Sequence, residues 1–349
     1  MLKNFEFIKK ITEAHGPAGS EDEIRDIIKE ELRDVCSSFD YDNLGSIICH
    51  LSKNKNIKVA IMAHMDEVGF LVEKITKDGY IRVYQLGGID PIIVQNNIVE
   101  IKTYSGSKIK GILSSDISSK ETKIGNLYID IGCKNESEVK ELGIEIGDSI
   151  TFTTQTQYLD SKNIVAKSWD DRIGCILGVE LLKKLKDIEL NCDLYFVGTV
   201  QEEIGTRGGK TSINKLQPDI IINLDVATAK NILGNKESGR NYEEGPCFVI
   251  ADKLALGNKI LIKEFIKSAQ IMGSKYQLDF LKGGGTDNGP GSNSGDGVAG
   301  LSVILPVKNC HTPYTMLNEN DYLECYNILE EFFKNIDEEF LSKIYSYKK

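Results

Sequence analysis

The sequence predicts a mixed α/β fold, in which a three-layer α/β/α domain is interrupted by a small all-β, barrel-like domain. In both end regions of the 349-residue chain, short apolar runs rich in β-branched residues alternate with helical patterns, which is typical of buried parallel strands. Between these regions, short alternating segments and repeated turn signals are typical of an antiparallel sandwich or barrel. We therefore expect one discontinuous domain, residues 1–69 and 164–349, and one insert, residues 70–163.

The end regions supply helices and buried strands in alternation. Ser-Glu-Asp-Glu at residues 20–23 matches a capping box and predicts an amphipathic helix to about residue 34. Helical periodicity returns at Asp171 and continues to about residue 186, and a final amphipathic helix is expected at about residues 319–336. The strands expected in this domain are residues 46–51, 58–63, 193–200, 220–224 and 301–305.

The insert reads as a series of short strands joined by tight turns. Alternation predicts strands at residues 80–84 and 97–102, and Lys-Asp-Gly at residues 77–79 is one of several turn signals. One short helix is expected at residues 137–142. We expect the insert to build subunit contacts and to shape access to the site of the other domain.

Composition excludes several classes of partner. The chain is 41% hydrophobic and 27% charged, as in an ordinary globular protein. A net charge of −10 disfavours nucleic acid and anionic membranes as partners, and no stretch approaches the roughly 20 apolar residues of a membrane span. The eight cysteines include no CxxC pair, and the first residues lack a secretion signal. We therefore expect a cytoplasmic protein with reduced thiols.

Histidines and carboxylates follow the apolar runs, where ligands gather in a parallel sheet. Several acids meeting at one sheet edge would repel one another unless cations lay between them. The set fits two divalent ions, each with one histidine and one carboxylate of its own, and one shared carboxylate. Three carboxylates against two divalent ions leave one positive charge, which a bound hydroxide would cancel. Such a hydroxide is a nucleophile at neutral pH. The pattern predicts a two-metal hydrolase, and its residues are His64, Asp66, Asp170, Asp171, Glu202, Glu203, Asp225 and His311.

Most of these residues have an ordinary structural reading when taken alone. His64 could be a loop histidine, and Asp170 could cap the helix that follows it. The adjacent acids Glu202 and Glu203 are more specific, because one can bind metal while the other acts as a general base. Cys310, directly before His311, is expected to be a packed thiol. The glycine-rich stretch 283–289 lacks P-loop spacing, so it is either a tight turn or a close approach to a ligand.

Several motifs together resemble the glutamyl and deblocking aminopeptidases, a family of dinuclear (cocatalytic) metallopeptidases. Its members, the tetrahedral aminopeptidases, build dodecamers and have sometimes been described as cellulases. The resemblance covers most of the chain and implies a phosphorylase/hydrolase-like metallopeptidase fold. The motifs that carry it include Ala-His-Met-Asp-Glu-Val-Gly at 63–69, Gly-Gly-Ile-Asp-Pro at 87–91, Trp-Asp-Asp-Arg at 169–172, Val-Gln-Glu-Glu-Ile-Gly at 200–205, Gly-Gly-Thr-Asp at 284–287 and His-Thr-Pro at 311–313.

The resemblance also implies a role for each site residue. Asp170 would bridge two ions, with His64 and Asp225 on one and Glu203 and His311 on the other. A cis peptide bond would join Asp170 to Asp171. Glu202 would be the general base, and Asp66 would orient His64. Substrate contacts are expected from Gly285, Thr286 and Asp287. The implied cofactors are two divalent ions, zinc or cobalt, with manganese as a third candidate.

The expected function is removal of N-terminal residues from short peptides by metal-hydroxide attack. A metal-dependent deacylase or carboxypeptidase on the same scaffold is the alternative, and a homo-oligomer, a tetrahedral dodecamer, is the expected assembly. A glycosidase is disfavoured because metal binding occupies the carboxylates that it would need free. The chain departs from the family pattern at residues 112–117, at residues 288–293 and at Thr315, where an acid is common. These departures bear on substrate choice and assembly and leave the proposed ligands in place.

Overall fold

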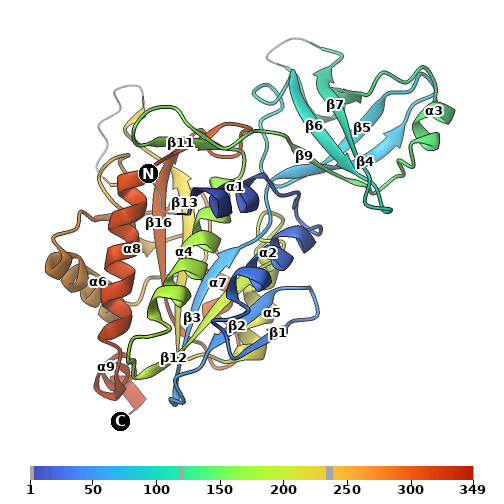
Figure 1. Cartoon of the computed structure of the whole chain (residues 1–349). Helices are drawn as coiled ribbons and strands as arrows, with labels where there is room; N and C mark the ends of the chain where they lie inside the picture. The colour runs from blue at the N-terminus through green and yellow to red at the C-terminus, as the bar shows by residue number, and fades with distance from the viewer. Residues whose placement is uncertain (1–3, 118–120, 233–238, 349) are drawn as a thin grey trace.

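A computed structural model describes residues 4–117, 121–232 and 239–348 of the chain. Residues 118–120, within the predicted insert, therefore lie outside the described part. The described residues form an 11-stranded sheet flanked by helices and, beside it, a closed six-stranded barrel (Figure 1). None of the described helices is long and apolar enough to cross a membrane. The α-helices are α1 (Phe5–Glu13), α2 (Asp22–Leu32), α3 (Glu136–Glu141), α4 (Trp169–Leu185), α5 (Arg207–Leu216), α6 (Lys259–Met272), α7 (Asn288–Ser292), α8 (Glu319–Lys334) and α9 (Glu338–Ile344).

The middle of the large sheet is formed by parallel strands in the order β12, β3, β13 and β16. Every residue of β12 is buried, as expected for a strand covered on both faces. The strands of this sheet are β1 (Ser38–Tyr41), β2 (Ile47–Leu51), β3 (Ile57–His64), β10 (Gln157–Tyr158), β11 (Asn163–Ala166), β12 (Cys192–Thr199), β13 (Ile220–Thr228), β14 (Cys247–Ala251), β15 (Gln277–Phe280), β16 (Ala299–Lys308) and β17 (Thr315–Asn318).

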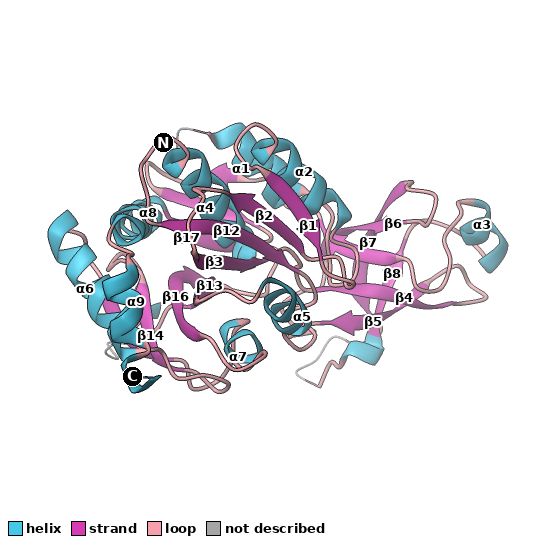
Figure 2. Ribbon diagram, turned by 90° about the horizontal axis from the view of Figure 1, so that it is seen from below, coloured by secondary structure: helices cyan, strands magenta, loops and turns pink. Residues whose placement is uncertain are grey.

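Helices cover both faces of this sheet (Figure 2). On one face α1, α2, α4, α6 and α8 contribute to one large apolar core, in which Trp169 is fully buried. On the other face Ile213 of α5 packs in a smaller cluster with Met62 and Val197 of the sheet. The predicted α/β/α architecture is confirmed, because apolar side chains leave both faces of the sheet and meet helices on each.

The barrel has a hydrophobic core of its own, which includes Phe70, Val99 and Ile129. It closes among the described residues in the order β4, β5, β8, β7, β6 and β9, so the predicted barrel-like domain is confirmed. Its strands are β4 (Gly69–Ile75), β5 (Ile81–Leu86), β6 (Asn97–Lys102), β7 (Lys108–Ser115), β8 (Leu127–Asp130) and β9 (Ser149–Phe152).

The exact limits of the insert stay a prediction. The barrel strands span residues 69–152, which supports the expected start of the insert. After β9 the chain returns to the large sheet, because β10 pairs with β11 and β11 with β17. We propose that the insert ends near residue 153, about ten residues before the predicted limit of 163.

One local prediction in this domain differs from the structure. The predicted capping box does not form, since α2 begins at Asp22 and its N-cap residue, Glu21, makes no capping hydrogen bond. Instead, Glu21 accepts hydrogen bonds from the backbone of Gly19 and Gln201, and Glu23 forms an ion pair with Lys102 of the barrel. Tertiary contacts therefore take both acidic side chains away from the helix end.

Candidate metal centre

The carboxyl ends of the parallel strands bring together residues that lie far apart in the sequence. His64 is the last residue of β3, and Glu202 and Glu203 follow β12. His311 lies in the loop after β16, and Asp170 lies in the first turn of α4. Because β3 and β12 pair in register up to His64 and Thr199, their ends meet at the same edge. This edge is where ligands gather in such sheets.

Asp225 is placed by a strand that is longer than predicted. The sequence indicated a strand ending at Leu224, whereas β13 continues to Thr228. Its pairing with β3 stops at Asn223, while its pairing with β16 continues. Asp225 therefore lies in a part of β13 that pairs with β16 and no longer with β3. Its Oδ1 lies 3.9 Å from His64 Nε2.

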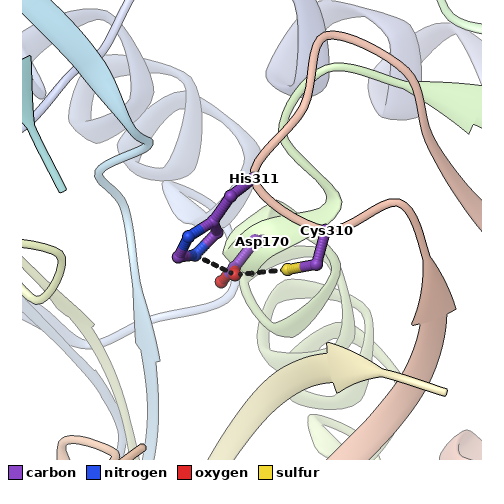
Figure 3. Close-up of side chains that lie close together, drawn as sticks. All are labelled: Asp170, Cys310 and His311. Carbon is purple, nitrogen blue, oxygen red and sulfur yellow. Dashed lines mark hydrogen bonds and ion pairs between the residues drawn. The ribbon is translucent and has the colours of Figure 1, made fainter. Parts of the chain in front are cut away.

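Asp170 lies between the two histidines. Its Oδ1 is 2.9 Å from His64 Nε2, and its Oδ2 is 3.1 Å from His311 Nε2. The peptide bond between Asp170 and Asp171 is cis, as the family resemblance implied. Figure 3 shows the Asp170 carboxylate facing both His311 and the thiol of Cys310, whose Sγ is 3.0 Å from Oδ2. One carboxylate thus offers a separate oxygen to each histidine.

Asp66 holds the other side of the site in position. Its two carboxylate oxygens accept hydrogen bonds from the backbone N–H groups of Glu202 and Glu203, at 3.0 and 3.1 Å. Its backbone carbonyl lies 3.1 Å from His64 Nδ1, and its Oδ1 lies 3.6 Å from the same nitrogen. Asp66 therefore links the end of β3 to the turn after β12 and lies beside the imidazole of His64, and its predicted orienting role stays a prediction.

The barrel reaches the site through the turn between β5 and β6. The backbone carbonyl of Gly88 lies 2.7 Å from His311 Nδ1. A proton on Nδ1 leaves Nε2 facing Asp170 and Glu203, whose Oε1 is 3.4 Å away. His311 has a left-handed backbone, with φ +58°, a conformation that non-glycine residues adopt rarely and often at functional sites. A Cβ on Gly88 would approach His311 Nδ1 to 3.3 Å, so a side chain there would make the imidazole shift by a few tenths of an ångström.

Burial and crowding perturb the charges of these residues. Burial, together with the nearby Asp170, raises the pKa of Asp225 to about 8. Burial likewise raises the pKa of Glu203 to about 8. Burial would lower the pKa of His311, but its contacts with Asp170 and Glu203 raise it to about 10. In the absence of metal, protons supply the positive charge that these carboxylates need.

The donor set fits divalent cations. Among the residues that the structure describes, three groups of side chains have donor atoms within 4.8 Å of one another: His64 with Asp171 and Asp225, His64 with Asp170 and Glu203, and Asp170 with Cys310 and His311. Asp171 Oδ2 and Glu203 Oε1 are buried and have no hydrogen-bond partner among the described residues. Buried carboxylate oxygens without partners are costly, and an ion bound among them would remove that cost.

A buried ion-pair cluster lies beneath the site and joins both parts of the molecule. Lys167 donates hydrogen bonds to Glu67 and, at 2.9 Å, to the carbonyl of Ala14. Arg172 Nη2 is 3.2 Å from Glu67 Oε1, and its Nε donates at 2.7 Å to the carbonyl of Met65. Glu67 also accepts a hydrogen bond from Thr151 of β9. This cluster therefore fixes the chain on both sides of Asp66.

The predicted substrate residues lie in a buried loop. Thr286 directs its hydroxyl to Asp252 and Ser302, while Asp287 accepts a hydrogen bond from Thr199 at the end of β12. A Cβ on Gly285 would meet the side chain of Leu254. The loop is thus packed against the ends of the strands, and substrate contact by these residues stays a prediction.

A family model described as M42 glutamyl aminopeptidase matches residues 45–328 of the chain. This span contains every proposed ligand, Asp66 and Glu202, and covers more than half of the chain. The chain belongs to the M42 glutamyl aminopeptidase family. The resemblance noted in the sequence is thereby confirmed, and with it the expectation that the chain is a peptide hydrolase that uses divalent metal.

Known proteins resemble this M42 peptidase over nearly its whole length. The glutamyl aminopeptidase of Lactococcus lactis is 30% identical, over 99% of this chain and 100% of that protein. The structure of the TET aminopeptidase from Thaumarchaeota archaeon SCGC AB-539-E09 superposes with a TM-score of 0.94 at 29% identity, covering 98% of this chain and 99% of that one. The Pyrococcus horikoshii TET1 peptidase, which can assemble into a tetrahedron or a large octahedral shell, gives 0.84 at 28% identity, with coverages of 95% and 99%.

Sequence reasoning missed two contributors to this M42 site. Gly88 acts through its backbone carbonyl, which no side-chain pattern reports. The sequence feature that could have indicated Gly88 is the Gly-Gly pair at residues 87–88, which follows the strand expected at residues 80–84. The Glu67–Lys167–Arg172 cluster was missed because no local pattern indicates that these residues, which lie beside the selected ones in the sequence, contact one another.

Proposed function

We propose that this M42 family member is a dinuclear-metal aminopeptidase that removes N-terminal residues from short peptides. One observation carries the proposal: the two oxygens of Asp170 face two different histidines, at 2.9 and 3.1 Å. A carboxylate in that position is suited to bridge two ions. His64 and Asp225 would hold one ion, and Glu203 and His311 the other. Zinc or cobalt suits these nitrogen and oxygen donors, with manganese as the third candidate.

The chain's own groups account for the remaining requirements. Bound divalent ions would supply Lewis acidity toward the peptide carbonyl and lower the pKa of water. Glu202 would accept a proton from the attacking water and return it to the leaving amine. In the absence of metal, burial, reinforced by nearby Asp225 and Asp287, raises the pKa of Glu202 well above its usual range, and a carboxylate can both take and give a proton. Asp66 would keep Glu202 and His64 in register.

Metal stoichiometry and substrate preference test this proposal together. The protein is dialysed against chelator, refilled with zinc, cobalt or manganese, and analysed for bound metal. Two ions per chain are expected, and Asp170→Asn should weaken both sites. Aminoacyl-arylamides should be cleaved, and their N-acetylated forms should not. Tight binding of a single ion with full activity would overturn the two-metal assignment, and preference for the acetylated substrates would favour the deacylase alternative.

We also propose that copies of this chain form a closed, dodecameric shell that admits short peptides. The TET1 peptidase of Pyrococcus horikoshii can assemble into a tetrahedron or a large octahedral shell. The barrel exposes an apolar surface suited to subunit contacts: Ile98 and Ile112 are cross-strand neighbours, and 54% and 51% of their respective surfaces are exposed. Ile92 and Ile93, in the segment between Gly88 and β6, are exposed as well. Light scattering over a range of concentrations measures the assembly directly.

A further inference from the structure

Adjacent residues after β16 reach the same carboxylate. In a strand, successive side chains point to opposite faces, but β16 ends at Lys308. Asn309 and His311 then adopt left-handed backbone conformations, with φ +57° and +58°. As a result, Cys310 and His311 both point to Asp170 (Figure 3). Cys310 Sγ is 3.0 Å, and His311 Nε2 is 3.1 Å, from the same oxygen, Oδ2.

A second group converges on this position. Glu203 Oε1 lies 3.4 Å from His311 Nε2. The Glu203 side chain is 5% exposed, and this oxygen has no hydrogen-bond partner within the described part of the chain. The space beside His311 therefore gathers an imidazole nitrogen, two carboxylates and a sulfur, with the donor atoms of Asp170, Cys310 and His311 within 4.8 Å of one another.

We propose that Cys310 is an additional, sulfur ligand for the ion on the His311 side. This inference rests on the proposed metal centre. As the ion binds, the Sγ–H bond breaks, its proton passes to solvent, and the sulfur keeps the electron pair that it donates to the metal. A soft sulfur donor favours zinc, cobalt and cadmium over manganese and magnesium, which prefer oxygen. Cys310 thereby sets the metal preference of this site.

Cobalt spectroscopy tests the assignment without reference to activity. The purified chain is loaded with Co²⁺, and its absorption is compared with that of Cys310→Ser. Thiolate bound to cobalt absorbs strongly in the near ultraviolet, whereas the visible ligand-field bands report any bound cobalt. The near-ultraviolet band is expected in the native protein and should disappear in Cys310→Ser, while the visible bands remain. Serine retains a hydroxyl donor toward Asp170, so the variant removes the sulfur and keeps the hydrogen bond.

Cys175→Ala is the matched control. Its thiol is also near the site but lies 3.3 Å from the backbone carbonyl of His64, so this variant should keep the near-ultraviolet band. Competition with cadmium provides a second readout: Cys310→Ser should bind Cd²⁺ at least about tenfold more weakly, since even partners outside the ligand set change affinity 10–100-fold, and should bind Mn²⁺ as before.

The outcomes separate the two proposals. Visible bands without a near-ultraviolet band in the native protein would overturn the sulfur ligand and leave the metal centre intact. The same would follow if the near-ultraviolet band persisted in Cys310→Ser. No cobalt bound by the native protein would instead overturn the proposed metal centre, and the sulfur ligand with it.

Discussion

At the scale of single residues, the two neighbouring glutamates differ through the backbone that presents them. Gln201 has a left-handed backbone, with φ +58°, and Asp66 then accepts the N–H groups of both Glu202 and Glu203. Glu203 faces His311, whereas the charges that act on Glu202 come chiefly from His64, Asp225 and Asp287. One turn thus sends two identical side chains into different surroundings.

This difference predicts different effects of the same substitution. Glu202→Gln should bind both metal ions and lose about 10²–10⁴-fold in kcat, because an amide cannot accept the proton. Glu203→Gln should instead bind one ion more weakly, and added metal should restore part of its activity. Metal titration and steady-state kinetics on both variants decide the matter. If both variants lost metal equally, the base and ligand roles would be misassigned.

The raised pKa values predict how the metal-free protein responds to pH. Glu203 and Asp225 titrate at about 8 when folded and at about 4 when unfolded. Between these values the folded state binds more protons than the unfolded state, so the contribution of these groups to stability falls as pH rises from about 4 to about 8. Bound metal ions would supply the positive charge that protons supply in the metal-free protein.

The thermal midpoint of chelator-treated protein should therefore be lower than that of zinc-loaded protein, and the difference should grow as pH rises from about 5 to about 8. The metal-free Asp225→Asn variant lacks one of these titrating groups. Its thermal midpoint should therefore differ less between pH values of about 5 and about 8 than that of the metal-free native protein. A constant difference between metal-free and zinc-loaded protein across the range would contradict the prediction.

At the scale of secondary-structure elements, the Glu67–Lys167–Arg172 cluster ties β3, α4 and the barrel together. Glu67→Gln would leave two buried cations without a negative partner, and such a loss typically costs about 3–5 kcal/mol. Chemical denaturation should show a decrease of this size. Glu30→Gln, which breaks an exposed ion pair with Lys10, is the control and should change stability little. Equal effects of the two substitutions would mean that the buried pair contributes no more than a surface one.

The elements also show what the sequence can and cannot predict. The buried parallel strands follow from their apolar runs, and the ends of those strands indicated His64, Glu203 and His311. The continuation of β13 beyond Leu224 was missed because it depends on β16 as a partner on one side only. The capping box failed because tertiary partners compete for Glu21 and Glu23. Local patterns report local preferences, and these errors arose where distant segments meet.

At the scale of the whole molecule, the exposed isoleucines of the barrel predict how assembly can be broken. Replacing both Ile98 and Ile112 by lysine adds two charges to neighbouring exposed positions on β6 and β7. The double variant should stay folded and become smaller by light scattering, since desolvating lysines at an interface core is unfavourable. Ile271→Lys, at a comparably exposed position (55%) on α6, is the control and should assemble normally. A native-sized double variant would place the subunit contacts elsewhere.

The hydrogen bond between Gly88 and His311 has a thermodynamic consequence for this molecule. Gly88 belongs to the part that we propose assembles, and His311 to the part that we propose binds metal. If subunit association shifts the β5–β6 turn and raises metal affinity by some factor, metal binding must raise subunit affinity by the same factor. Filling the site would then tighten the shell, and removing the ions would loosen it. Metal availability and quaternary structure would thus form a single coupled equilibrium.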